Sequence, residues 1–148
     1  MYSQQQRQRW MSVLASSPAA ELLDGWRALD LKVPFAVIRA PETGLTQLIG
    51  RMGATGRRFV LGDMTVTRAV VRLDSGPYGY SYVAGRDKAH AELCALADAV
   101  LQRAEHHERL HRQLIEPLSA RLREQHQSRA REIAASRVDF FTLVRGDN

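Results

Sequence analysis

Two histidines four positions apart give the sequence its most recognisable chemical pattern. His107, Glu108 and His111 form H-E-x-x-H, which on a helix places both imidazoles on one face. There they can bind zinc while the glutamate acts as a general base. The flanking residues Glu105 and Arg112 are charged, and no clear third ligand follows in a glycine-containing extension. We therefore interpret the stretch as a polar, solvated helix and expect neither a metal site nor a catalytic residue in this chain.

Glycines at positions 50, 53 and 56 stand among several arginines, and a glycine-rich loop can bind phosphate through its backbone N–H groups. The stretch lacks the lysine and the following helix of a P-loop. The spacing of Gly53 and Gly56 is that of the RNA-clamping loop of KH domains, but here the glycines join two predicted strands. A hairpin turn is the interpretation that we favour.

The chain is basic, with 21 Lys and Arg against 16 Asp and Glu, a formal charge of +5 and a pI of about 10.0. Arginine supplies 19 of the 21 positive residues, and its guanidinium is suited to phosphates and carboxylates. A solvated surface explains most of this excess. Because acidic residues are interspersed throughout, a basic nucleic-acid-binding module is only the alternative function, and we expect no nucleic-acid partner. The candidates for anion contacts near the predicted sheet are Arg39, Arg68, Arg72 and Arg86.

The single cysteine, Cys94, excludes an intramolecular disulfide. It lies in the apolar half of a predicted helix, so we expect it to be buried and inert. The apolar stretch at 10–15 is too short for a secretory signal, and no run approaches the ~18 apolar residues of a membrane span. These features predict a cytoplasmic protein that does not enter the membrane.

The elements around these residues predict an α+β fold. We expect helices at 4–15 and after Ser17, with Ser17 as N-cap and Pro18 at the first helical position. Short strands are expected at 35–39, 45–51, 57–61, 65–73 and 78–83, separated by turns at 41–44, 53–56, 62–63 and 74–77. Together they predict an antiparallel meander of four or five strands, with N-terminal helices before it and two long C-terminal helices after it.

The C-terminal third shows an unusual distribution of apolar residues. A helix from Lys88, capped by Asp87, is expected to reach about Ile115, and Pro117 should break or restart it. The next helix, 118–136, has a thin apolar stripe, so it lies half in water or packs on another chain. An aromatic tail follows at 137–148, which is either a sealing strand or a partner anchor. The candidate partner interface is formed by Leu118, Leu122, Ile133, Val138, Phe140, Phe141 and Leu143.

Five stretches in this order resemble one family. They are residues 39–45 (RAPETGL), 62–73 (GDMTVTRAVVRL), 79–88 (GYSYVAGRDK), 90–96 (HAELCAL) and 135–146 (ASRVDFFTLVRG). The chain resembles the PhnG subunit of the bacterial carbon–phosphorus lyase system from Trp10 to Asp147. The resemblance therefore implies a single domain over 1–148, made of N-terminal helices (1–30), a sheet (34–84), long helices (88–136) and the tail (137–148).

The resemblance also implies a function. Members of this family work in a core complex with PhnH-, PhnI- and PhnJ-type subunits, which transfers the ribose triphosphate part of ATP to an alkylphosphonate and releases adenine. ATP and the phosphonate are substrates of the complex, and no cofactor is expected in this chain. We therefore expect a non-catalytic or accessory subunit that is required for phosphonate catabolism.

Overall fold

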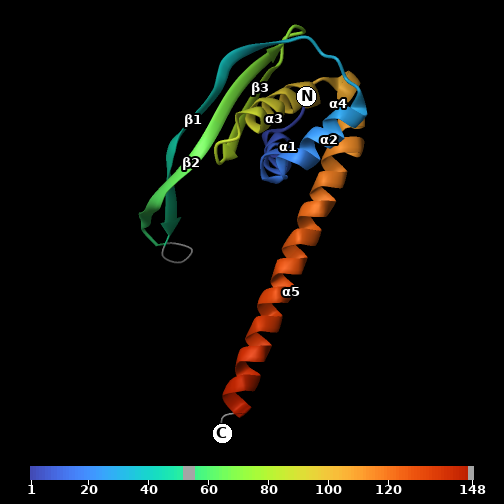
Figure 1. Ribbon diagram of the computed structural model, residues 1–148. Helices are drawn as coiled ribbons and strands as arrows, with labels where there is room; N and C mark the ends of the chain where they lie inside the picture. The colour runs from blue at the N-terminus through green and yellow to red at the C-terminus, as the bar shows by residue number, and fades with distance from the viewer. Residues whose placement is uncertain (52–55, 147–148) are drawn as a thin grey trace.

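The computed structural model describes residues 1–51 and 56–146, with side chains described as far as residue 136. Three antiparallel strands form one sheet in the order β1-β2-β3: β1 (Phe35–Arg51), β2 (Arg58–Leu73) and β3 (Tyr78–Ala84). Helix α3 (Lys88–Leu101) covers one face of the sheet, beside α1 (Gln4–Ser16) and α2 (Ala19–Leu29) (Figure 1). The α+β class is confirmed, but the prediction of four or five strands is wrong.

Two predicted turns are bulges inside long strands, and this explains the smaller number of strands. At Pro41 the register shifts between Arg39 and Glu42, and β1 continues. Pro41 is tolerated because β1 lies at the edge of the sheet and the bulge removes the need for its missing N–H. At Gly62 the neighbouring Leu61 is the extra residue, since Leu48 pairs with Gly62 and Ile49 with Val60. The predicted turn at 53–56 falls largely outside the described residues.

Close packing between β3 and α3 positions the sheet on the core. Gly79 faces α3, and a Cβ added there would lie 1.8 Å from the Ala95 carbonyl oxygen. This approach is possible only because glycine has no side chain. The expected N-cap of α3 is confirmed, since the Asp87 carboxylate accepts a 3.0 Å hydrogen bond from His90 N–H. The largest fully buried aliphatic side chains of the core are Leu14, Leu22, Leu29, Val66, Val71, Leu73, Val100, Leu101, Leu110 and Leu114.

The C-terminal helices break at a different place from the one predicted. Helix α3 ends at Leu101, and Arg103 is extended before α4 (Ala104–Leu110) begins. The chain then passes without a break through a π-helical turn, η1 (His111–Ile115), into α5 (Glu116–Gly146). In the π turn Glu116 N–H bonds to the His111 carbonyl, and this wider turn loosens the helix just before Pro117. The missing N–H of Pro117 is thereby accommodated, and the predicted break at 117 is wrong.

The connection between α1 and α2 also differs from the prediction. Ser17 does not cap α2: its hydroxyl donates a 2.6 Å hydrogen bond to the Val13 carbonyl at the end of α1. Pro18 occupies the N-cap position of α2. Helix α1 itself is confirmed, and it begins with a capping box between Ser3 and Gln6. None of the helices in the described part of the chain is long and apolar enough to cross a membrane.

Candidate functional site

Of the H-E-x-x-H residues, His107 of α4 packs against Trp10 of α1. His107 Nδ1 lies 2.8 Å from the Leu101 carbonyl oxygen, and because a carbonyl only accepts, this nitrogen carries the proton. The His107 ring stacks on Tyr2 with centroids 3.9 Å apart, and on His111 at 5.7 Å. Glu108 points to solvent and pairs with Arg112 at 2.7 Å. Within residues 1–51 and 56–136, no group of three or more His, Cys, Asp or Glu could hold a metal ion.

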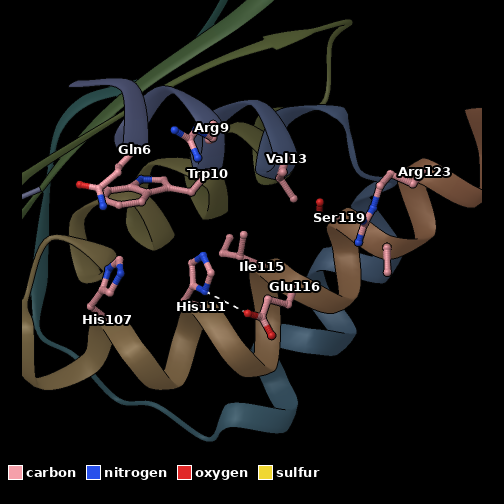
Figure 2. Close-up of a pocket in the computed structure, with 11 residues that line it drawn as sticks. Gln6, Arg9, Trp10, Val13, His107, His111, Ile115, Glu116, Ser119 and Arg123 are labelled. Carbon is pink, nitrogen blue, oxygen red and sulfur yellow. Dashed lines mark ion pairs between the residues drawn. The ribbon is translucent and has the colours of Figure 1, made fainter. Parts of the chain in front are cut away.

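The same histidines line a groove of about 550 Å³ between α1 and the helix formed by α4, η1 and α5 (Figure 2). Trp10, Val13 and Ile115 form its apolar part. Arg9 reaches it from α1 and Arg123 from α5, and Figure 2 shows the two side chains well apart, with Val13 between them. The two guanidinium groups therefore do not converge on one anion. In the same groove, His111 Nδ1 lies 3.5 Å from Glu116 Oε1.

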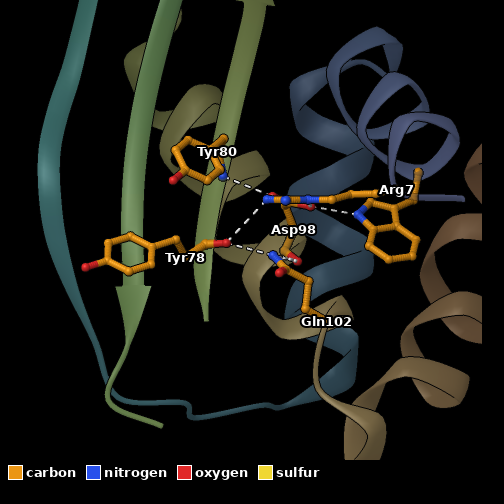
Figure 3. Close-up of polar contacts among 6 residues, drawn as sticks. Arg7, Tyr78, Tyr80, Asp98 and Gln102 are labelled. Carbon is orange, nitrogen blue, oxygen red and sulfur yellow. Dashed lines mark hydrogen bonds and ion pairs between the residues drawn. The ribbon is translucent and has the colours of Figure 1, made fainter. Parts of the chain in front are cut away.

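The buried carboxylate of Asp98, in α3, accepts hydrogen bonds from both α1 and β3 (Figure 3). Asp98 is fully buried and accepts hydrogen bonds from Arg7 Nε (3.1 Å), Arg7 Nη2 (2.7 Å) and Tyr80 N–H (3.0 Å). The hydrogen bond to Asp98 raises the pKa of Arg7. The backbone N–H of Tyr80 points away from β2 and is satisfied by Asp98, which protects this edge of the sheet from pairing with another strand.

Three of the four predicted anion-contact residues lie together. Arg68 and Arg72 are exposed on one face of β2, and Arg39 pairs with Val70 between them. Directly paired residues share a face of the sheet, so Arg39, Arg68 and Arg72 stand on the face opposite α3. Arg86 lies beyond the end of β3, in the connection to α3, and is separate from these three.

The predicted partner-interface residues are differently placed. Leu118 is only 2% exposed and belongs to the chain's own core. Leu122 is half-buried, while Ile133 is exposed on α5. The side chains of Val138, Phe140, Phe141 and Leu143 lie outside the described residues, but their backbone continues α5 as helix to Gly146. The tail is therefore not a strand that seals the sheet.

An exposed apolar ribbon is the feature that sequence reasoning missed. Strand β3 pairs with β2 only from Val66 to Arg72, so residues 45–51 of β1 and 58–65 of β2 form a two-stranded arm beyond the helices (Figure 1). We call this segment the β-arm. Such a ribbon is marginally stable alone in water, and large exposed apolar patches mark interaction sites. Its exposed apolar residues are Leu45, Leu48, Ile49, Phe59, Val60 and Leu61.

The one cysteine is buried, as predicted. Its thiol points at the Leu14 carbonyl oxygen, with Sγ 3.4 Å away. Burial raises the pKa of the Cys94 thiol to about 12, and the negative charges of Asp87 and Asp98 add to the effect. Because the thiolate is the nucleophilic form, Cys94 is not a nucleophile near neutral pH.

Comparisons with known proteins found a matching family and a matching curated protein. The family described as "Phosphonate metabolism protein PhnG" matches residues 5–146. A curated protein of Rhizobium meliloti (strain 1021) is 44% identical over 146 residues, which cover 97% of this chain and 91% of the relative. That relative is named alpha-D-ribose 1-methylphosphonate 5-triphosphate synthase subunit PhnG. The matched range includes the sheet, the β-arm, the helices and the exposed arginines Arg39, Arg68 and Arg72.

Proposed function

The chain belongs to the PhnG family of phosphonate metabolism proteins, and from this premise we propose that it is a subunit of a ribose 1-methylphosphonate 5-triphosphate synthase. The resemblance read from five sequence motifs is confirmed by the family match and by the 44% identical relative. The name of that relative describes one subunit of a multi-subunit enzyme.

Within this complex we propose an accessory role rather than a catalytic one. The residue types that could do chemistry have structural partners: His107 bonds to a backbone carbonyl, Asp98 fastens three elements, and Cys94 is buried. The proposed partners are PhnH-, PhnI- and PhnJ-type subunits, with ATP and an alkylphosphonate as substrates of the assembly and no cofactor held by this chain. A cytoplasmic location, expected from the sequence, is part of the same proposal.

The β-arm is the observation that carries the subunit role. By strand alternation its apolar side chains lie on both faces of the ribbon. In the part of the chain that the structure describes, no helix lies over this ribbon (Figure 1). Burying a Leu, Val, Ile or Phe side chain contributes ~1.5–3 kcal/mol, so a partner that encloses the arm would gain binding energy from several residues at once. A polar hairpin would serve a free monomer better, because exposed apolar strand edges favour aggregation.

A pair of matched substitutions tests this role. Val60→Asp places a charge in the β-arm, whereas Val37→Asp places the same charge on an exposed position of β1 outside it. Each tagged variant is co-expressed with the other three subunits and purified by its tag. We expect Val60→Asp to lose most of the co-purifying subunits and Val37→Asp to retain them. Undiminished assembly of a folded Val60→Asp chain would rule out the arm as the interface.

Helix α5 is the second proposed contact. Ile133 is exposed on it, and Phe140 and Phe141 follow in the same helix. Aromatic anchors commonly carry much of the energy of an interface. We expect the double substitution Phe140→Ala and Phe141→Ala to reduce co-purification several-fold while far-UV circular dichroism stays unchanged. Full assembly of this variant would remove the aromatic pair from the interface.

A further inference from the structure

The sheet face opposite α3 carries arginines and tyrosines in ordered rows. Strand β2 lies in the middle, and its residues pair on both sides. Arg72 pairs with Tyr78, Val70 with Tyr80, and Arg68 with Tyr82. On the other side Arg39 pairs with Val70, and Glu42 with Arg68. We define the Arg–Tyr face as Arg39, Arg68, Arg72, Tyr78, Tyr80 and Tyr82.

Strand alternation fixes the direction of these side chains. Gly79 lies against the α3 backbone, and Ser81 and Val83 are buried on the same side. Because successive side chains of a strand point to opposite faces, the three tyrosines point away from α3. Their exposures are 43%, 45% and 48%. The Arg72 guanidinium lies over the Tyr78 ring, 5.7 Å from its centroid, so the two residue types form one surface.

We propose that the Arg–Tyr face binds an acidic surface segment of another subunit, an inference that rests on the subunit role proposed above. Guanidinium groups form bidentate hydrogen bonds with carboxylates. Tyrosine and arginine are the residue types enriched among the energetically dominant positions of protein interfaces. The basic charge of the whole chain favours the approach of an acidic partner, because complementary charge accelerates and orients association.

The shape of the face favours a protein partner over a small phosphorylated molecule. Tyr80 and Tyr82 border a hollow of about 280 Å³ beside α1, and the Arg7 guanidinium lies 5.4 Å from the Tyr80 ring centroid. Small-molecule sites enclose most of the ligand, whereas nearly half of each tyrosine remains exposed. Single-stranded nucleic acid also uses aromatic and basic platforms. Here, however, Glu42 stands directly opposite Arg68, and its negative charge opposes a phosphate backbone. An acidic protein segment can space its carboxylates to meet the arginines and avoid Glu42, whereas a phosphate backbone carries its charge at every unit.

The face is continuous with the β-arm. Both are built on β1 and β2, with the arm beginning where β3 ends its pairing at Val66. One partner lying along these two strands would therefore meet an apolar segment and then a charged, aromatic one. This order is that of a protein interface with an apolar centre and a polar rim.

Charge reversal tests the inference. The double variant Arg68→Glu and Arg72→Glu is compared with Arg27→Glu and Lys32→Glu, which changes the net charge equally at exposed positions outside the face. A third variant, Arg68→Gln and Arg72→Gln, removes the charge without reversing it. Each tagged chain is co-expressed with the other subunits and purified at low and high salt. We expect a tenfold or greater loss of co-purifying subunits for the Glu variant, a smaller loss for the Gln variant and none for the control.

The outcomes separate this inference from the proposed function. Failure of the wild-type chain itself to co-purify with any subunit overturns the proposed function. If the wild type assembles and the folded Gln and Glu variants assemble equally well, the Arg–Tyr face is not the contact and the inference is overturned. The inference is also overturned if these variants keep their subunits but lose binding to a fluorescein-labelled single-stranded oligonucleotide that the wild type binds, because the face then recognises nucleic acid.

Discussion

Trp10 Nε1 donates a 2.8 Å hydrogen bond to Oδ1 of Asp98, across 88 positions of sequence. Trp10 is itself buried at 3% exposure, so a polar contact lies in the middle of the packing between α1 and α3. The same carboxylate receives Arg7 and the Tyr80 N–H. One side chain thus determines how three separate elements meet, and α1 in turn forms one wall of the histidine-lined groove.

Removing this carboxylate should therefore destabilise the fold. Asp98→Ala leaves the Trp10 and Tyr80 donors without their partner and removes the counter-charge of Arg7. We expect the free energy of unfolding to fall by about 3–5 kcal/mol, the usual result of breaking a buried ion pair from one side. Asp98→Asn should lose less, because it keeps an acceptor oxygen. Urea unfolding of the purified chain measures both, with the exposed Asp24→Ala as the control. A loss no larger than that of the control would contradict the assigned role.

Gly79 offers a second test of the packing between β3 and α3. An alanine Cβ at this position would lie 1.8 Å from the Ala95 carbonyl oxygen, which is backbone and cannot rotate away. We expect Gly79→Ala to lower the free energy of unfolding by about 1–3 kcal/mol or more, the range for overpacked sites. Gly44→Ala is the matched control, since nothing lies within 4 Å of an added Cβ there. Equal stability of the two variants would show that α3 does not press on β3.

The Cys94 thiol makes stability depend on alkaline pH. Its pKa is raised to about 12 in the folded chain, whereas an unfolded cysteine ionises near 8.5. Between these values the folded state retains a proton that the unfolded state releases, so the stability falls as the pH rises from about 8.5 towards 12. Urea unfolding at pH 7.5 and 9.5 measures this fall in stability. The fall should be smaller for the Cys94→Ala variant, because it has no thiol at this position.

The same burial predicts slow chemical modification. Iodoacetamide at pH 8.5 should alkylate Cys94 at least tenfold more slowly in the folded chain than in urea, because both access and thiolate content are reduced. Equal rates in the two conditions would mean that the thiol is exposed.

The H-E-x-x-H residues should affect stability rather than metal binding. His107→Ala removes the hydrogen bond to Leu101 and the stacking on Tyr2, which together should lower the free energy of unfolding by ~1–2 kcal/mol. His126→Ala, at an exposed position of α5, should change it little. An equimolar amount of zinc should leave the melting temperature of the wild type unchanged. A zinc-dependent rise that His107→Ala abolishes would instead establish a metal site.

Local patterns were sufficient to predict several features. The strand predicted at 78–83 is confirmed as β3, and the structure buries the smaller residues that alternate with Tyr78, Tyr80 and Tyr82. The N-cap at Asp87 and helix α1 were also predicted, because caps and amphipathic spacing act over one or two turns of chain. The five motifs identified the correct family, because they occur in order along nearly the whole chain.

Tertiary structure decided whether the prolines and glycines that favour turns interrupt a strand or a helix. Pro41 and Gly62 signal turns locally, but cross-strand pairing converts both into bulges and joins short strands into long ones. Pro117 signals a helix break, but the π turn before it absorbs the missing hydrogen bond. The helix breaks at Gln102, where neither glycine nor proline indicates a break. The Gln102 side chain donates a hydrogen bond to the Tyr78 carbonyl oxygen of β3.

Exposure, too, was settled only by the assembled fold. A periodic pattern shows that an apolar face exists but does not show whether another element reaches it. Leu118 belongs to the thin stripe of a polar helix and is nevertheless buried in the core, whereas Leu48 and Val60 resemble core strand residues in the sequence and are exposed. The physical reason is length. Strands β1 and β2 extend past the end of β3 and past the helices that cover the sheet (Figure 1), so the apolar surface of the β-arm stays exposed.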